Sequence, residues 1–488
     1  MLTGVNLLLR FVSTGFQVYL SGRIGAAGIG LLQLVMSVGS LAMTAGMAGI
    51  RTATMYLTAE ELGRKRSGNV TWVLSGCLLY SIVCSGVIAV VLRVFAPFLA
   101  EHWIGNADTV PAIRLLSCFI PVTCLCGVMV GYFTAANRIG TLAIVEIAEQ
   151  LFSMAITMLV LILWAGTDPS RACQSVIFGS GLSGCLTLGC LVILRVREKS
   201  STAARLPVRR RLLQAAVPLA LADDLKAGIS TTENLMVPKR LALYAGIENP
   251  LAAFGMVCGM VFPVLMFPAA ILFGLAELLI PELARCAAAG SERRIRYLAK
   301  RSLRVALLYG CLFCGLEFLL AKELCTALYK NPEAGAYLRL YALLIPMLYC
   351  DAITDAMIKG LGQQTASVRY NILTSSMDVA FLFLLLPRYG MMGYFFSFLV
   401  THLLNFILSL RRLLKLVGTV ISAKIAVFAI AATGCAAFVA SHVSTPGIRA
   451  ASFVVIWSLL LFLLQVLGKE DIAWIKGLIM KKNREGCQ

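Results

Sequence analysis

Apolar stretches of about 20 residues alternate with short polar connections along almost the whole chain. Because a helix needs about 20 apolar residues to cross the hydrocarbon core of a bilayer, each stretch predicts one transmembrane helix. The pattern is typical of an all-α polytopic membrane protein with about 14 transmembrane helices, and it lacks the alternation of an outer-membrane barrel. The predicted helix centres lie near residues 10, 43, 84, 122, 152, 184, 226, 266, 308, 347, 377, 401, 430 and 458.

The connections fall into two alternating sets that differ in charge. One set, which includes "GRKRSGN", "RVREKSSTAARLPVRRR" and "MKKNREGCQ", is rich in Lys and Arg. The other set, which includes "SGRIGAAG", "KNPEAG", "RYG" and "SHVSTPGIR", holds few of them. Because basic connections stay on the cytoplasmic side, we expect an even number of helices and two cytoplasmic termini.

The longest basic connection divides the predicted helices into two groups. It separates an N-lobe of helices 1 to 6, at residues 1–198, from a C-lobe of helices 7 to 12, at residues 212–416. Between them lies a basic cytoplasmic linker at 199–211. Two further helices at 417–468 and a cytoplasmic amphipathic tail at 469–488 follow the C-lobe.

A faint internal repeat favours two pseudo-symmetric six-helix lobes. The segment "YFTAANRIGTLAIVEIAEQ" from Tyr132 has a counterpart in "MIKGLGQQTASVRYNILTS" from Met357. Both segments predict a helix end, a small polar turn and the start of the next helix. Transporters commonly arise from duplicated halves of this kind.

Composition agrees with the membrane class and narrows the chemistry. The chain is 59% hydrophobic and 14% charged, with a mean hydropathy of +0.86. Its net charge of +19 is explained by cytoplasmic connections that face anionic lipid headgroups, so no nucleic-acid partner is needed. The 16 cysteines lie mostly in apolar helices, where they pack as small hydrophobic groups, and the three histidines are scattered. We therefore predict no metal site, no cofactor and no enzymatic activity.

Polar side chains line one face of several predicted helices. A charge at mid-bilayer costs about 2.5–3.5 kcal/mol on insertion scales, so such groups usually face a bundle interior or an aqueous cavity. The faces hold Asn6, Arg10, Ser13, Thr14 and Gln17; Gln33, Ser37, Ser40, Thr44, Arg51 and Thr54; Glu146, Glu149, Gln150, Ser153 and Thr157; Asp223, Lys226, Ser230, Glu233 and Asn234; and Asp351, Asp355 and Lys359. We expect them to line one water-filled cavity between the lobes.

Arg10 and Arg51 are the best candidates for substrate contact, because neither has an acid nearby in the sequence. An unpaired guanidinium beside a cavity is suited to bidentate binding of phosphate. Lys226, Glu233 and Asn234 complete the predicted substrate-binding set.

The predicted ion-coupling or cavity residues are Asp223, Glu146, Glu149, Asp351 and Asp355. A structural role is an equal alternative for each carboxylate. The three charged residues of helix 10 follow one another at every fourth position, as in an ion-pair ladder that fixes helix packing. Asp223 and Lys226 could pair in the same way, and the GxxxG pairs Gly127/Gly131 and Gly255/Gly259 favour helix packing over function.

Several segments resemble the stage V sporulation protein B family, part of the multidrug/oligosaccharidyl-lipid/polysaccharide flippase superfamily. They are "GRIGAAGIGLLQLV", "GYFTAANRIGTLAIVEIAEQ", "ENLMVPKRLALYAG", "GMVFPVLMFPAAILFGLAELLIPELA" and "IKGLGQQTASVRYNILTSSMDVAFLFLLLPRYGMMGY". The resemblance implies a V-shaped, two-lobed transporter of the multidrug-extrusion fold in a bacterial cytoplasmic membrane. It also implies a lipid-linked oligosaccharide as cargo, in the export of peptidoglycan or a related cell-wall precursor, and sporulation is a role of some family members. Related lipid II flippases use cavity arginines, and Arg10 and Arg51 occupy comparable places.

The leading hypothesis is a flippase for a saccharide linked to undecaprenyl diphosphate, which works by alternating access. Its partners would be that lipid-linked oligosaccharide, membrane lipids and cell-wall synthesis enzymes. A coupling cation, sodium or proton, or the membrane potential would drive it. The alternative is a cation-coupled multidrug exporter of the same fold, which the acids Glu146 and Glu149 keep open. A membrane scaffold is disfavoured, because it needs no aligned polar faces. A membrane transferase is disfavoured, because no reachable loop of this chain holds candidate catalytic groups.

Overall fold

The computed structural model describes residues 2–63, 67–166, 168–197, 208–419 and 423–466. These residues form helices joined by short turns, and no strand occurs among them, so the predicted all-α fold is confirmed. The predicted amphipathic tail at 469–488 and most of the basic linker at 199–211 lie outside the described residues.

The chain forms two compact units. Unit 1 comprises Met1–Met260 and Ser375–Ser397, and unit 2 comprises Val261–Thr374 and Phe398–Gln488. The helix α14 (Gln364–Val417) therefore contributes its middle part to unit 1 and its two ends to unit 2. The lobe boundaries predicted from the basic linker stay a prediction.

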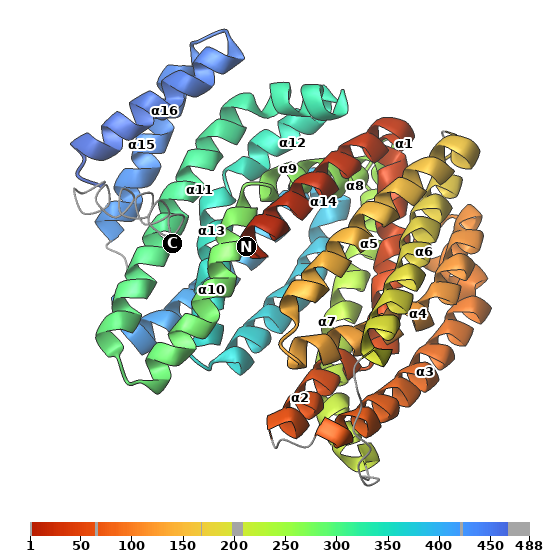
Figure 1. The fold of residues 1–488 in the computed structure, drawn as a ribbon. Helices are drawn as coiled ribbons and strands as arrows, with labels where there is room; N and C mark the ends of the chain where they lie inside the picture. Colours follow the sequence, from red (N-terminus) through yellow and green to blue (C-terminus); the bar gives the residue numbers. More distant parts are fainter. Residues whose placement is uncertain (1, 64–66, 167, 198–207, 420–422, 467–488) are drawn as a thin grey trace. The chain divides into compact units, whose positions relative to one another are not determined.

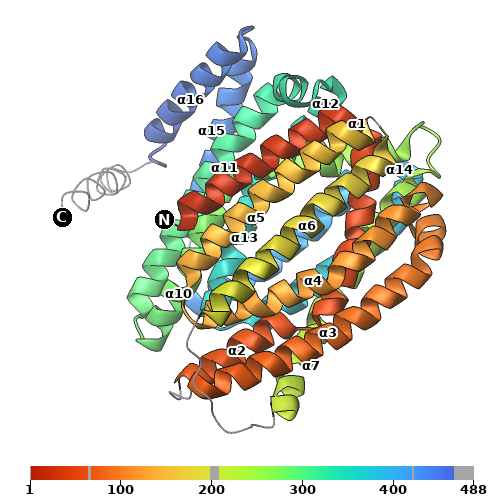
Figure 2. The same ribbon diagram turned by 45° about the vertical axis from the view of Figure 1, so that its right-hand side comes forward.

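Unit 1 is built from long helices that lie side by side. Its elements are α1 (Leu2–Met47), α2 (Ile50–Gly63), α3 (Ser67–Phe98), η1 (Leu99–Ile104), η2 (Ala107–Thr109), α4 (Val110–Ala135), α5 (Ile139–Val160), η3 (Leu161–Ala165), α6 (Pro169–Val196), α7 (Val208–Leu241) and α8 (Pro250–Met256). Figures 1 and 2 both show α3 beside α4 and α5 beside α6. The helix α1 also packs against α7 and α8.

Unit 2 packs around α11, which is its longest complete helix. Its elements are α9 (Phe262–Met266), α10 (Ala269–Ala288), α11 (Glu292–Tyr329), α12 (Pro332–Ala342), α13 (Ile345–Gly360), α15 (Ala423–Ser441) and α16 (Pro446–Leu463). The boundary between the units falls in η4 (Val257–Val261), of which only Val261 belongs to unit 2. The helices α12 and α13 contact α11, and α15 and α16 form a pair that also contacts it (Figure 1).

Within the described residues, nine helical segments are long and apolar enough to cross a membrane, and the number rises to 11 if each of two bent helix pairs is one span. All the predicted helix centres lie in helices. The number of qualifying segments is smaller than the number of predicted spans, partly because Phe11–Leu62 and Gln364–Val417 each hold two predicted spans. The charged helix α7 is not among the qualifying segments. The total of 14 spans stays a prediction.

Two predicted connections are kinks rather than loops. The helix α1 bends at Gly25 (φ 68°, ψ 179°) inside "SGRIGAAG", and α14 bends at Gly390 (φ 56°, ψ −136°) at the end of "RYG". Glycine adopts such angles readily because it has no Cβ. A helix-to-helix change of direction therefore needs only one residue at each place.

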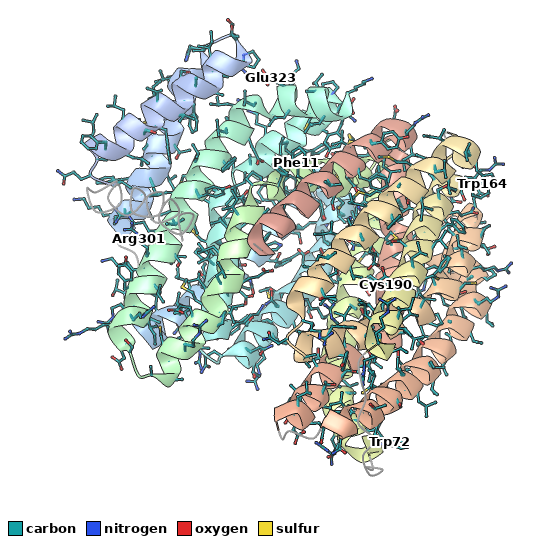
Figure 3. All side chains as sticks on the ribbon, in the orientation of Figure 1. Phe11, Trp72, Trp164, Cys190, Arg301 and Glu323 are labelled. Carbon is teal, nitrogen blue, oxygen red and sulfur yellow. The ribbon has the colours of Figure 1, made fainter. Side chains whose placement is uncertain are left out.

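The surface of α3 shows how unit 1 meets the bilayer. Its exposed side chains include Leu79, Ile82, Val83, Val87, Val90 and Val94. Exposed tryptophans lie near the helix ends, and Figure 3 labels Trp72 and Trp164 at opposite ends of unit 1. Apolar flanks with tryptophans at both ends are typical of a protein that spans a membrane. The chain is a multi-pass membrane protein.

The predicted internal repeat is confirmed at its central turn. The turn between α4 and α5 and the turn between α13 and α14 share one hydrogen-bond pattern. Arg138 N donates to Phe133 O, and Gln363 N donates to Ile358 O, both at 3.0 Å. The residue before each donor has a positive φ, 58° in the first turn and 75° in the second. The same local structure therefore recurs in each unit, in the register of the repeat.

Glycines of the two GxxxG pairs lie where helices approach closely. A Cβ at Gly131 of α4 would lie 2.5 Å from Arg51 O of α2, and a Cβ at Gly255 of α8 would lie 2.0 Å from Ala26 O of α1. No larger side chain fits at either place without a shift of the backbone. The packing role predicted for these glycines is confirmed.

Candidate functional site

Polar side chains of α1 join it to α5 and α7 inside unit 1. Gln150 Nε2 donates to Ser13 Oγ at 3.0 Å. Asn234 Nδ2 donates to Ser37 Oγ at 3.0 Å, and Thr231 Oγ1 donates to Ser37 O at 3.1 Å. The polar residues of α1 therefore contact the predicted polar face of α5 at one place and that of α7 at another, within this unit.

Glu233 is the next residue of the polar face of α7, and it meets a second carboxyl group. The carboxyl group of Glu233 lies close enough to that of Asp378 for the two groups to interact. Asp378 also accepts a hydrogen bond from Ser397 Oγ at 2.5 Å, and only 6% of its surface is exposed. Two neighbouring carboxyl groups repel each other when both are ionised, and they can form a hydrogen bond when they share a proton. The pair can therefore hold a proton, or a cation when both groups are ionised.

Arg51 lies directly after a break in the helical chain. The sequence predicts one continuous face from Gln33 to Thr54, but α1 ends at Met47, and Ala48 and Gly49 have φ of 44° and 69°. The prediction of one continuous helical face was wrong, because the turn at Ala48 and Gly49 interrupts the helix. Arg51 sits in the first turn of α2, its side chain is exposed, and it has no ion pair with any described residue.

Arg10 lies in α1, but its side chain belongs to the part of the chain that the structure does not describe. Its predicted role stays a prediction.

Four other predicted site residues have different surroundings. Asp223 and Lys226 are exposed on α7, and no ion pair between them occurs in the described part of the chain. Glu146 is exposed on α5. Glu149 lies near the side chain of Thr187, and its backbone oxygen accepts a hydrogen bond from Ser183 Oγ at 2.6 Å, which joins α5 to α6.

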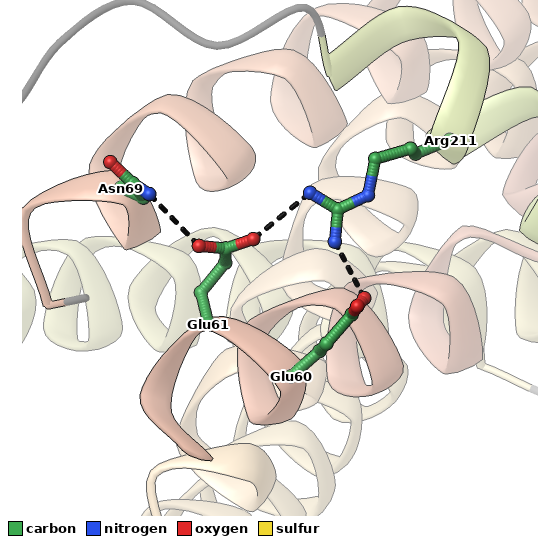
Figure 4. Close-up of polar contacts among 4 residues, drawn as sticks. All are labelled: Glu60, Glu61, Asn69 and Arg211. Atoms are coloured by element: carbon green, nitrogen blue, oxygen red, sulfur yellow. Dashed lines mark hydrogen bonds and ion pairs between the residues drawn. The ribbon is translucent and has the colours of Figure 1, made fainter. Parts of the chain in front are cut away.

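A charged cluster that the sequence analysis missed ties α7 to α2 and α3 (Figure 4). Arg211 donates to Glu60 Oε2 at 2.6 Å and to Glu61 Oε1 at 2.9 Å. Asn69 Nδ2 donates to the other oxygen of Glu61 at 2.9 Å. The hydrogen bonds to Glu61 and Glu60 raise the pKa of the Arg211 guanidinium above its ordinary value. Only 1% of the Glu61 side chain is exposed, so this cluster holds helix ends together.

Unit 2 contains a cavity of about 190 Å³ that both polar and apolar side chains line. Its polar lining comes from α13 and α14 and consists of Asp351, Asp355, Asn371, His402 and Asn405. Met266, Leu272, Phe273 and Leu348 form much of its apolar wall. Two predicted ion-coupling residues of helix 10 therefore line one cavity.

Asp351 keeps one oxygen without a partner in this cavity. Asn405 Nδ2 donates to Asp351 Oδ2 at 3.0 Å. Asp351 Oδ1 and Asn405 Oδ1 are buried and have no hydrogen-bond partner among the described residues. Both atoms are acceptors, so the group they would take is a cation or a donor such as water.

Asp355 is satisfied by its neighbours. Lys359 Nζ lies 2.6 Å from Asp355 Oδ2, and Ser367 Oγ donates to Asp355 Oδ1. The ion-pair ladder predicted for helix 10 is thus formed between Asp355 and Lys359, while Asp351 binds Asn405 instead. Asp355 has a structural partner, and Asp351 is the better candidate for an ion.

Known proteins share this fold. The family model MatE matches residues 244–384. The stage V sporulation protein B of Bacillus subtilis (strain 168) is 21% identical over 407 residues, which cover 80% of this chain and 77% of that protein. The predicted resemblance to that family is therefore confirmed.

Solved structures of transporters resemble this chain in fold. The lipid II flippase MurJ in an inward closed conformation matches with a TM-score of 0.68 and 11% identity, over 97% of this chain and 99% of that chain. An inward-facing multidrug resistance MATE family transporter of the MOP superfamily matches with a TM-score of 0.65 and 14% identity, over 84% of this chain and 95% of that chain. The protein shares the fold of these transporters.

Proposed function

We propose that this protein is a flippase that moves a lipid-linked oligosaccharide across the bacterial cytoplasmic membrane by alternating access. The proposed cargo is a peptidoglycan or other cell-wall precursor on an undecaprenyl diphosphate carrier. Two findings support the proposal: the similarity to a stage V sporulation protein B and the fold shared with a lipid II flippase. The same relative supports a role in sporulation.

The observation that carries the proposal is the position of Arg51. It lies in the first turn of α2, directly after the break at Ala48 and Gly49. The first turn of a helix has N–H groups without intrahelical acceptors, and the helix dipole favours a negative charge there. An exposed arginine at such a place suits a diphosphate, because backbone and guanidinium donors can bind the same group. In this proposal Arg10, Lys226 and Asn234 also contact the headgroup.

The proposed coupling group is the carboxyl pair of Glu233 and Asp378. During the transport cycle the pair would release a shared proton and then take up another proton or a sodium ion. Ser397 would orient Asp378. Asp351 with Asn405 is the corresponding proposal for unit 2. Asp223, Glu146, Glu149 and Asp355 would line the path, and the membrane potential would add to the driving force.

Coupling is tested with Glu233→Gln. This variant removes a titratable group and keeps a side chain of the same shape. We expect transport to fall at least about tenfold, because the pair can no longer take up and release a proton. Thr232→Ala, an exposed neighbour on the same helix, is the control and should leave transport unchanged. Transport at the unaltered rate by Glu233→Gln would remove this pair from the coupling scheme.

The proposed surroundings follow from the cargo. Both termini would be cytoplasmic, membrane lipids would surround the helices, and cell-wall synthesis enzymes would supply and consume the substrate. No nucleic acid, cofactor or catalytic step is part of this proposal.

A cation-coupled multidrug exporter is the second candidate. It is favoured by the MatE family model and by the fold shared with a multidrug resistance transporter. An exporter of cations needs acids beside the substrate, and the exposed Glu146 is the acid of α5 that remains available. Resistance to cationic dyes on overexpression, lost with Glu146→Gln, would support the exporter over the flippase.

The experiment that tests the flippase is complementation. Cells depleted of their essential lipid II flippase would express this chain or one of its variants, and growth and surface-exposed lipid II would be measured. We expect the unaltered chain to restore both and Arg51→Ala to fail at equal membrane abundance. Arg93→Ala is the matched control, because Arg93 is an exposed arginine of the same unit. Failure of the unaltered chain would contradict lipid II as cargo, and rescue by Arg51→Ala would contradict the role of Arg51.

A further inference from the structure

Unit 2 also contains a hollow that is larger than the cavity at Asp351 and Asp355 and separate from it. It has a volume of about 690 Å³ and lies between α11, α12 and the pair α15–α16. Its lining includes Phe318, Leu319, Lys322, Glu323, Arg339, Leu343 and Arg449. The connections "KNPEAG" and "SHVSTPGIR", both from the set poor in Lys and Arg, meet beside it. In the proposed topology this is the external end of the unit.

Three cationic side chains line the hollow, and one of them is bound by other groups of the protein. Arg449 Nη1 lies 2.8 Å from Glu323 Oε1. Arg449 also donates to the carbonyl oxygens of Val443 at 2.8 Å and Ser444 at 3.1 Å. This arginine therefore ties the start of α16 to α11 and has little capacity left for a ligand.

The other two cations remain available. Lys322 and Arg339 are exposed, and neither forms an ion pair with any described residue. The Arg339 guanidinium lies over the ring of Phe318 at 4.4 Å from its centroid. Stacking fixes the plane of the guanidinium and leaves its N–H edge free to bind an oxyanion. An ammonium and an oriented guanidinium in one hollow are suited to a phosphate group.

The side chains of the walls indicate which phosphate-containing ligand fits the hollow. Phe318, Leu319, Leu340 and Leu343 make much of the hollow apolar, and 53% of the Leu343 surface is exposed. Lys322 lies seven residues before the end of α11 at Tyr329, or about 10 Å along the helix, which is a suitable depth for a headgroup. A ligand with a phosphate and an apolar body matches these walls better than free phosphate does.

We propose that this hollow is a binding site for an anionic glycerophospholipid. Its phosphate is bound by Lys322 and Arg339, and its glycerol and acyl chains lie against the leucines. The lipid bridges α11 and α12 to the C-terminal helix pair α15–α16. This site is separate from the proposed path of the cargo, and it would bind whether or not the chain is a flippase.

The test is lipid retention by the full-length protein, delipidated in detergent and titrated with phosphatidylglycerol or phosphatidylcholine. Native mass spectrometry would count the bound lipids, and thermal unfolding would report stabilisation. We expect phosphatidylglycerol to bind at least about tenfold more weakly to Lys322→Gln and to Arg339→Gln than to the unaltered protein. Lys300→Gln, an exposed lysine nearer the other end of α11, is the matched control and should bind as the unaltered chain does.

Three outcomes would overturn the proposal. Equal retention of phosphatidylglycerol by Lys322→Gln, Lys300→Gln and the unaltered protein would show that the hollow does not bind it. Equal binding of phosphatidylcholine would show that the negative charge is not recognised. Stabilisation by inorganic phosphate alone, lost with Lys322→Gln, would assign the site to free phosphate. Because Lys322 is exposed and unpaired, its variant should fold even if Arg339→Gln does not.

Discussion

The two ends of α2 carry charged side chains that differ in whether the protein supplies an ion-pair partner. At the first turn, Arg51 is exposed and has no ion-pair partner within the described residues. At the last turn, Glu60 and Glu61 are both bound by Arg211 of α7, and Asn69 completes the set (Figure 4). One end of the helix is held by the protein, and the other end presents a cation that the protein leaves unneutralised.

The same contrast occurs in unit 2, four residues apart on α13. Asp355 is neutralised by Lys359 at 2.6 Å, while Asp351 has one buried oxygen without a partner. Burying a charge is costly, so a charge with a partner from the chain contributes to packing. A charge without such a partner persists where a ligand or ion uses it. Partnership therefore separates structural from functional charges, and the predictions below test that separation.

The largest effect on stability is expected from Arg211→Ala. This change leaves Glu61, of which 1% is exposed, without its cation. We expect a loss of about 2 kcal/mol in the free energy of unfolding, below the 3–5 kcal/mol of a fully buried pair because about a third of Arg211 is exposed. Denaturation in detergent, followed by tryptophan fluorescence, measures it. Lys226→Ala, an exposed cation of the same helix, should change stability by less than about 0.5 kcal/mol. Equal effects would refute the structural role.

An effect of similar size is expected from Gly131→Ala, which links stability to Arg51. The new Cβ would lie 2.5 Å from Arg51 O, so α2 must shift. We expect a loss of about 2 kcal/mol in unfolding free energy and reduced transport. Gly127→Ala, one turn away on α4, is the control, because its Cβ would lie 3.4 Å from the flexible end of Met47 and 3.9 Å from Arg51 Cβ, which are ordinary van der Waals contacts. If Gly131→Ala transports normally, the position of Arg51 does not matter for transport.

The smallest effect on stability separates the two aspartates of α13. Asp355→Asn removes the partner of Lys359 and should cost about 1 kcal/mol of unfolding free energy, because both groups are partly exposed. Asp351→Asn should cost less, because Asp351 Oδ1 has no partner to lose. We expect the order to reverse for transport, with Asp351→Asn the more damaged. Denaturation and transport of both variants decide this, and the same order in both assays would contradict it.

The sequence predicted the features that depend on nearby residues. Helix positions follow from hydropathy, and the pair Asp355–Lys359 follows from its spacing of four residues. The shared turn at Arg138 and Gln363 was visible as a repeat. In each case the interacting groups lie within one helix or one turn, so the order of residues determines their geometry.

Features formed between distant segments were missed. Arg211 and Glu61 are 150 residues apart, and nothing in the local pattern of either pairs them. Asp378 was overlooked because it is the single carboxylate of an apolar stretch, although its rarity there was a usable signal. The break at Ala48 and Gly49 was missed because "TAGMAGI" also suits a continuous helix. Tertiary contacts select the turn, and they are not encoded in hydropathy.

The most direct test of the account is a flipping assay with the purified protein in liposomes. Its substrate would be a fluorescent saccharide on undecaprenyl diphosphate, and the measured quantity is the rate at which label crosses the bilayer. The account predicts flipping by the unaltered chain and by Arg93→Ala, partial flipping by Arg51→Lys, and at least about tenfold slower flipping by Arg51→Ala, because the bidentate contact with diphosphate is lost. Flipping by Arg51→Ala at the unaltered rate would contradict it.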